Sequence, residues 1–267
     1  GVGAIHNKLG NLYQAQLRLE EALAENKSAL AIFEHLGQRS KEALILSNIA
    51  ILEFNLRQYD QALLDHQAAA AMHRALGDST GLATSLGNLA NVELALGDTT
   101  SALELLAAAG AHFKRRGLLR EFAVQANNEA GVRLARGEAT RAVALYSEAL
   151  AIRRQAGDRK AIASSLTGLA DADLHVGRLS EAVRNARQAL ALSQAVGAVS
   201  ETMQAYKILA RIHARMGNAD STLSYHERYA TVRDSVFSAD MSGRVAQLQA
   251  RIGLERKEYE LQQQRAD

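Results

Sequence analysis

The sequence predicts an all-α protein, a solenoid of about six two-helix repeats followed by a C-terminal helix. Proline, the commonest helix breaker, is absent from all 267 residues, and aromatic residues make up only 4% of the chain. Hydrophobic residues make up 48% and charged residues 22%, which is ordinary for a folded globular chain. The third observation is an internal repeat, and a fixed period of this length is the signature of a solenoid.

Glycines mark a period of forty residues. One series consists of Gly37, Gly77, Gly117, Gly157 and Gly197, and a second, offset by twenty, consists of Gly97, Gly137, Gly177 and Gly217. Between successive glycines, apolar residues follow helical spacing, as at Leu86, Leu89, Val92 and Leu96. Each repeat is therefore predicted to be two helices. The predicted solenoid is 1–238, with repeats near 1–39, 40–79, 80–119, 120–159, 160–199 and 200–238.

The helix boundaries and the packing of each pair also follow from the repeat. The glycines stand where a left-handed cap ends a helix, and Asp78, Asp98 and Asp158 can cap the next helix. Two columns of small residues predict a close approach of helices. The first column is Gly10, Ala50, Ala90, Ala130, Ala170 and Ala210, and the second is Ala22, Ala62, Ala102, Ala142 and Ala182, ending at Thr222.

This pattern resembles the tetratricopeptide repeat family, through Leu9, Gly10 and Tyr13 in the first helix and Ala22 and Ala29 in the second. The resemblance covers about nine tenths of the chain and implies a right-handed superhelix. Two features depart from the family: glycine replaces the usual proline, and the Tyr13 column changes. That column continues as Glu53, Glu93, Arg133, Asp173 and His213. We interpret it as a ladder of ion pairs between neighbouring repeats; paired catalytic carboxylates are the alternative.

In this family the first helices line a concave face, which places a set of polar side chains in a groove. The predicted peptide-binding residues are Asn7, Asn11, Asn48, Asn88, Asn91, Asn127, Asn128, Lys207, Arg211 and Arg215; Lys8, Asp171 and His175 share the groove. Asn48, Asn88 and Asn128 form one column. A carboxamide both donates and accepts hydrogen bonds, as a peptide backbone does. The similarity to tetratricopeptide adaptors and kinesin light chains implies that this column holds a peptide's main chain.

Both groups of groove residues have an alternative interpretation. The asparagines could bond to the backbones of neighbouring helices or simply face water. Lys207, Arg211 and Arg215 lie three or four residues apart on one helical face, which favours an acidic segment or a C-terminal carboxylate. A solvated basic face is the alternative for these three.

Nothing in the sequence indicates an enzyme, a metal or a cofactor. The net charge of +2 gives no case for binding nucleic acid, and the absence of Cys excludes disulfides and thiolate chemistry. "GDSTG" at 77–81 matches a hydrolase string around Ser79, but it links two helices instead of a strand and a helix. The "NKS" string at Asn26 lies within a predicted helix. His66, His73 and His112 lack a compact ligand spacing, and packing roles are expected for them.

The pattern changes after the sixth repeat. Met241, Val245, Leu248, Ile252 and Tyr259 form a short heptad seam, so 239–267 is predicted to be a linker or coiled-coil-like helix. It would either pack on repeat six or pair with a second copy to give a homodimer. Residues 225–264 resemble the end of tetratricopeptide sensor regions in bacterial diguanylate cyclases and histidine kinases.

That resemblance implies a sensor or scaffold part of a bacterial signal-transduction protein. In such proteins the repeats form a periplasmic domain of an inner-membrane protein, so the parent chain would be membrane-anchored. The alternative is a purely structural cytoplasmic scaffold that dimerises through the C-terminal helix. About 20 apolar residues directly after Asp267 would favour the periplasmic interpretation, and a polar continuation the cytoplasmic one.

Overall fold

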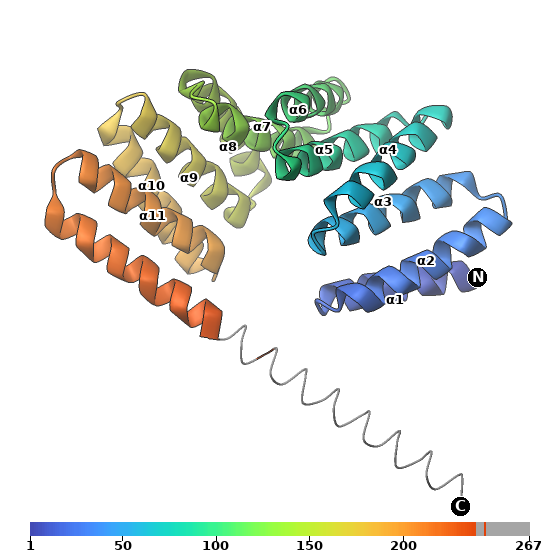
Figure 1. Cartoon of the computed structure of the whole chain (residues 1–267). Helices are drawn as coiled ribbons and strands as arrows, with labels where there is room; N and C mark the ends of the chain where they lie inside the picture. The colour runs from blue at the N-terminus through green and yellow to red at the C-terminus, as the bar shows by residue number, and fades with distance from the viewer. Residues whose placement is uncertain (239–242, 244–267) are drawn as a thin grey trace, which may run out of the picture.

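The chain folds into a solenoid of paired antiparallel helices, and residues 1–238 and 243 are described in this computed structural model (Figure 1). The helices are α1 (Val2–Ala15), α2 (Leu19–His35), α3 (Arg39–Asn55), α4 (Tyr59–Ala75), α5 (Ser79–Leu96), α6 (Thr99–Arg115), α7 (Leu119–Ala135), α8 (Ala139–Ala156), α9 (Arg159–His175), α10 (Leu179–Ala195) and α11 (Val199–Arg215). A further helix spans 219–238, and no strand occurs in the described part of the chain. The prediction of an all-α solenoid is confirmed.

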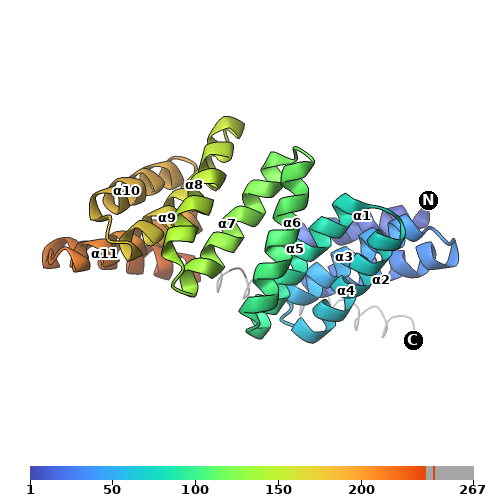
Figure 2. The ribbon, with the colours of Figure 1, turned by 90° about the horizontal axis from the view of Figure 1, so that it is seen from above.

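The helices stack strictly in chain order. Each odd-numbered helix packs on the even-numbered helix that follows it, and each even-numbered helix packs on the first helix of the next repeat. Odd-numbered helices also contact each other at α3–α5, α7–α9 and α9–α11. The arc in Figure 1 and the view from above in Figure 2 show the pairs following one another from α1 to α11. Because neighbours approach most closely on the inner side of an arc, the odd-numbered helices line its concave face.

The turns between helices follow the predicted glycine series. All nine glycines of the two series have positive φ, from +62° at Gly37 to +93° at Gly97. Asp78, Asp98 and Asp158 accept hydrogen bonds from backbone N–H groups in the first turns of α5, α6 and α9, as predicted. The first two repeats depart from the rule. Leu17 and Arg57 adopt the left-handed conformation at positions where later repeats have glycine.

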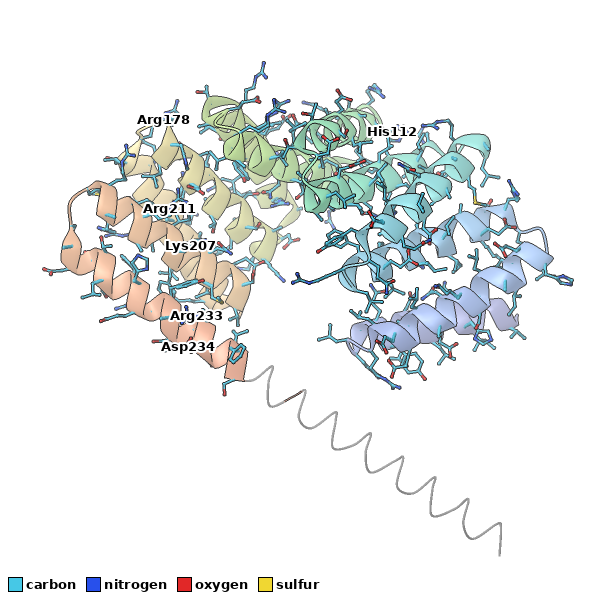
Figure 3. The ribbon with its side chains drawn as sticks, viewed as in Figure 1. His112, Arg178, Lys207, Arg211, Arg233 and Asp234 are labelled. Carbon is cyan, nitrogen blue, oxygen red and sulfur yellow. The ribbon has the colours of Figure 1, made fainter. Side chains whose placement is uncertain are left out.

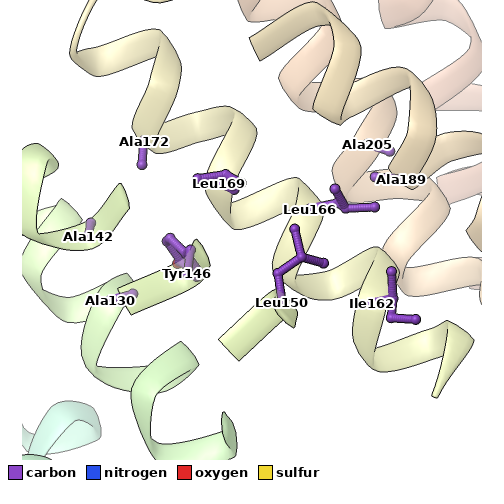
Figure 4. Packing of buried hydrophobic residues seen from close by; sticks show 10 residues of the cluster. All are labelled: Ala130, Ala142, Tyr146, Leu150, Ile162, Leu166, Leu169, Ala172, Ala189 and Ala205. Atoms are coloured by element: carbon purple, nitrogen blue, oxygen red, sulfur yellow. The ribbon is translucent and has the colours of Figure 1, made fainter. Parts of the chain in front are cut away.

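The small-residue columns lie where helices approach most closely. The five alanines of the second column are completely buried, as are the alanines of the first column. A Cβ atom on Gly10 would collide with the side-chain amide of Asn26, so the close approach of α1 and α2 requires glycine there. Larger apolar residues fill the space between these contacts. Figure 4 shows one such cluster, in which Tyr146 of α8 lies between Ala130 of α7 and the α9 residues Leu169 and Ala172.

The predicted ladder of ion pairs along the Tyr13 column is wrong, because most of these side chains turn toward their own repeat. Arg133 Nη1 donates to Glu138 Oε2 at 2.7 Å, in the turn before α8. Asp173 Oδ2 accepts from Asn185 Nδ2 of α10 at 2.9 Å. Glu53 reaches a neighbouring repeat only through Lys27 Nζ, at 4.0 Å. This position of the first helix faces the second helix of the same pair, and Glu53, Asp173 and His213 are buried there.

The predicted C-terminal helix, with its heptad seam and homodimer contact, lies outside the described residues. Helices α3, α5, α7, α9 and α11 each begin one residue before the start of a predicted repeat range. Within the described residues, no helix is both long enough and apolar enough to span a bilayer.

Candidate peptide-binding groove

Each odd-numbered helix from α3 to α11 presents one stripe of more accessible positions to the concave face, spaced four, three and four residues apart. The stripes are Leu44, Asn48, Ile51 and Asn55 on α3; Thr84, Asn88, Asn91 and Ala95 on α5; Val124, Asn128, Gly131 and Ala135 on α7; Ser164, Gly168, Asp171 and His175 on α9; and Gln204, Ile208, Arg211 and Arg215 on α11. Ile208 is buried and the others are partly or fully exposed. Members of the α9 and α11 stripes line two hollows, so the stripes form the floor of a groove.

The asparagine column lies in these stripes, on α3, α5 and α7. Asn48, Asn88 and Asn128 are all half-buried. Asn48 Nδ2 donates to Asn7 Oδ1 at 3.3 Å, which links the first two repeats and leaves Asn48 Oδ1 without a hydrogen bond. Among the described residues nothing hydrogen-bonds to the side chains of Asn88, Asn91 or Asn128. Their amides are therefore free to pair with a ligand.

Asn127 differs from the other predicted asparagines. Its Oδ1 accepts from Arg153 Nη1 at 3.0 Å and from Ser165 Oγ at 3.0 Å. Arg153 Nη1 also donates to Ser165 Oγ and to the carbonyl of Ala161. Asn127 thus helps to hold a buried guanidinium between the fourth and fifth repeats, and burial lowers the pKa of that Arg153. Only its amide nitrogen is left for a ligand.

The far end of the groove carries charged side chains. Arg211 Nη1 lies 2.8 Å from Asp171 Oδ1, and His175 Nδ1 lies 3.3 Å from the same oxygen. His175, Arg211 and Arg215 line a hollow of about 360 Å³. Lys207 is exposed, and Figure 3 labels it with Arg211 on α11. The three predicted basic residues thus share one helix, but Arg211 is already paired with a carboxylate.

The remaining sequence candidates have structural surroundings. Asn11 is exposed on α1. Ser79 begins α5 beside the capping Asp78, as expected for a helix–helix link. Asn26 is completely buried and its Nδ2 donates to the carbonyl of Ala22. His73 Nδ1 lies 2.8 Å from Asp78 Oδ2. In the described part of the chain, no three His, Asp or Glu side chains come together as a metal site would need.

Sequence reasoning missed three groove-side residues. Arg153 occupies the position that is phenylalanine at Phe33 and Phe113 in other repeats. This change from an aromatic to a charged residue is the feature of the sequence that could have drawn attention to it. Tyr146 is 6% exposed, and burial, with the nearby charge of Asp171, raises its pKa to about 12. Glu201, in the first turn of α11, has a buried Oε2 without a hydrogen bond.

The fold and the groove define an α-solenoid repeat protein. The sequence model of the tetratricopeptide repeat matches residues 41–114 and 122–195, which is more than half of the chain. The chain belongs to the tetratricopeptide repeat family. Among curated proteins, none matches the sequence.

Solved structures with the same fold share little sequence with this chain. BtubC (BKLC) from P. vanneervenii has a TM-score of 0.70 at 18% identity, over 82% of this chain and 92% of that one. A putative kinesin light chain from Podosopora anserina has a TM-score of 0.61 at 19% identity, over 72% and 95%. A Rap protein complexed with Competence and Sporulation Factor has a TM-score of 0.68 at 14% identity, over 88% and 65%. At these identities the likeness shows the fold alone.

Proposed function

We propose that this protein is a non-enzymatic interaction scaffold that binds an extended segment of a partner protein in its concave groove. The observation that carries the proposal is the neutral floor formed by α3, α5 and α7. Their twelve stripe positions contain no charged side chain, and five of the twelve are asparagines: Asn48, Asn55, Asn88, Asn91 and Asn128. An array of amides without charge suits a peptide backbone, which is polar but neutral.

The spacing of the amides supports an extended ligand. Asn88 and Asn128 occupy the same position in successive repeats and have no hydrogen-bond partner among the described residues. An extended strand has a donor and an acceptor on each residue, and these groups need partners when water is excluded. Apolar stripe neighbours such as Leu44, which is 51% exposed, and Val124, which is 46% exposed, offer contacts for the ligand's side chains. A Rap protein with the same fold forms a complex with Competence and Sporulation Factor.

A peptide-display experiment tests this function. Dodecapeptides selected from a random library on the native chain are titrated calorimetrically against the triple variant Asn48→Ala, Asn88→Ala, Asn128→Ala. Each lost hydrogen bond removes about 0.5–1.5 kcal/mol, so the affinity falls by about tenfold or more while the melting temperature changes little. Gln67→Ala with Gln188→Ala, two exposed amides on the even-numbered helices, is the matched control. Unchanged affinity in the triple variant would contradict the proposal.

We further propose that the scaffold is the sensor part of a bacterial signal-transduction protein, with the repeats in the periplasm and the parent chain membrane-anchored. The likeness of residues 225–264 to the end of such sensor regions supports this. Alkaline phosphatase is active only in an oxidising compartment, so its fusion to the full parent chain, after the sixth repeat, reports the location. Alkaline phosphatase activity is expected from this fusion. An inactive phosphatase fusion, with fluorescence from a green fluorescent protein fusion at the same position, would favour the cytoplasmic scaffold instead.

A further inference from the structure

A hollow of about 270 Å³ opens in the groove between α7, α8, α9 and α11. Tyr146 and Gly168 line it, and Leu134 and Ile208 contribute its apolar part. A Cβ atom on Gly168 would collide with the Tyr146 ring, so the ring lies directly against the α9 backbone. Glycine at this stripe position therefore leaves no side chain between the α9 backbone and the buried ring of Tyr146.

Two carboxylates, those of Asp171 and Glu201, line this hollow, and no basic side chain of the described residues does. The Tyr146 residue is 6% exposed, and among the described residues its hydroxyl has no hydrogen-bond partner. Glu201 also lines the hollow, and its Oε2 is buried and unpartnered. A carboxylate oxygen without a donor in such a position costs free energy until a donor arrives.

Among the described residues, Lys160 is the one cation paired with Glu201, and it pairs with the other oxygen, Oε1. Lys160 Nζ lies 3.8 Å from the other oxygen of Glu201, and the lysine side chain is 68% exposed. Arg211 is paired with Asp171, which also lines the hollow. Arg153 lines the adjoining hollow of about 230 Å³, and its Nη1 donates to neutral oxygens. The hollow thus combines an unpartnered carboxylate oxygen, a second carboxylate and an aromatic ring.

We propose that this hollow binds the side chain of a lysine or arginine residue of the bound peptide. The cationic head donates to Glu201 Oε2 and lies near the Tyr146 ring, which attracts cations through its π-face. The methylene groups of the ligand pack on Leu134 and Ile208, since long basic side chains cover apolar surface while the charged head stays polar. The proposal rests on the proposed function, because the side chain belongs to the peptide that lies in the groove.

A single-residue probe tests the pocket independently of the rest of the peptide. N-acetyl-arginine methylamide is titrated into the native protein while the Gly168 amide resonance is followed by NMR. N-acetyl-citrulline methylamide has the same shape without the charge and serves as the matched ligand. A saturable shift is expected with the arginine probe, and about tenfold or weaker binding with citrulline, since hydrogen bonds to charged groups are the stronger ones.

Single-residue variants test whether the Glu201 carboxylate binds the charged group of the arginine probe. Glu201→Gln keeps the size of the side chain and is expected to weaken arginine binding about tenfold to a hundredfold. Glu104→Gln, an exposed carboxylate on α6, is the control and leaves binding unchanged. The triple asparagine variant also keeps the probe affinity, although it loses the selected peptides. No saturable shift, equal binding of citrulline, or full binding by Glu201→Gln overturns the basic-side-chain pocket. Loss of selected peptides in the triple variant tests the groove function separately.

Discussion

Repeats two to four and the last two repeats share a backbone but differ in the chemistry of the groove. In the groove, α3, α5 and α7 present neutral stripes, whereas α9 and α11 present Asp171, His175, Arg211 and Arg215. One buried column of the second helices, which packs between repeats, is polar in its last two members and also at His73. Its members are Phe33, His73, Phe113, Arg153 and Ser193.

The difference shows which positions hold the fold and which are free to vary. Apart from Gly10 and Thr222 at their ends, the two small-residue columns are alanine in both halves, because they set the distance between helices. The Phe33 column tolerates an aromatic ring, a guanidinium or a hydroxyl, since each repeat contacts only its neighbours and can adapt locally. The polar members bring partners with them: Arg153 is held by Asn127 and Ser165, and Ser193 by Thr202. The C-terminal half has therefore exchanged apolar packing for hydrogen bonds near its charged groove.

The largest expected effect tests this exchange within a single column. Phe113→Ala empties a site packed against Phe122 and Ala123 and should lower the free energy of unfolding by about 3–5 kcal/mol. Ser193→Ala removes a hydroxyl that accepts from Thr202 at 2.9 Å, and about 1 kcal/mol is expected. Urea denaturation of both variants measures the difference. Equal losses would mean that the two halves are held in the same way.

The repeat made most of the fold predictable. The forty-residue period located the helices, the glycine caps and the alanine columns, because each of these features depends on backbone geometry common to all repeats. The same argument located the stripe that contains Asn88 and Asn128, since helical period alone decides which positions share a face.

The rest depends on contacts that differ from repeat to repeat. Asn127 stands one residue before Asn128, but its carbonyl oxygen binds Arg153, and no spacing rule foretells which neighbour a flexible guanidinium reaches. The interpretation of the Tyr13 column as an ion-pair ladder was wrong for the same reason, because the partner of each side chain depends on local contacts. Alternating charges suggested pairing along the column, whereas Arg133 pairs with Glu138 of its own repeat. The hollow under Gly168 needed coordinates, because it is created by the ring of Tyr146 from a different helix.

A second prediction concerns acid stability, which the second repeat should limit. Another buried column contains Asn26, His66, Leu106, Tyr146 and Ala186. His66 is 1% exposed, and burial lowers its pKa from 6.5 to about 4. The folded state therefore disfavours the protonated ring, so stability is complete above pH 6.5 and is lost as the pH falls toward 4.

His66→Leu places in the second repeat the residue that the third repeat has at Leu106. The variant should retain about 3 kcal/mol more stability than the native chain at pH 4, relative to their difference at pH 8. Urea denaturation at both pH values measures this. His226→Leu, at the exposed member of the same column, is the control and should not change the pH dependence. If the native chain and His66→Leu lose stability in parallel, the buried histidine is not the acid-sensitive group.

The smallest expected effect concerns the turns, where the N-terminal half is the less regular. Leu17 and Arg57 have φ of +60° and +63°, and the same position in later repeats is Gly97, Gly137, Gly177 and Gly217. A side chain in this conformation costs about 1–2 kcal/mol, and glycine gives back about 0.4–1 kcal/mol through the greater freedom of the unfolded chain. Leu17→Gly and Arg57→Gly should thus each stabilise the protein by about 0.5–1 kcal/mol, measured by thermal unfolding. Gly177→Arg is the reverse exchange in the C-terminal half and should destabilise it by a similar amount. If the glycine variants are less stable than the native chain, contacts of the Leu17 and Arg57 side chains outweigh the backbone strain, and the turns of the two halves are equivalent.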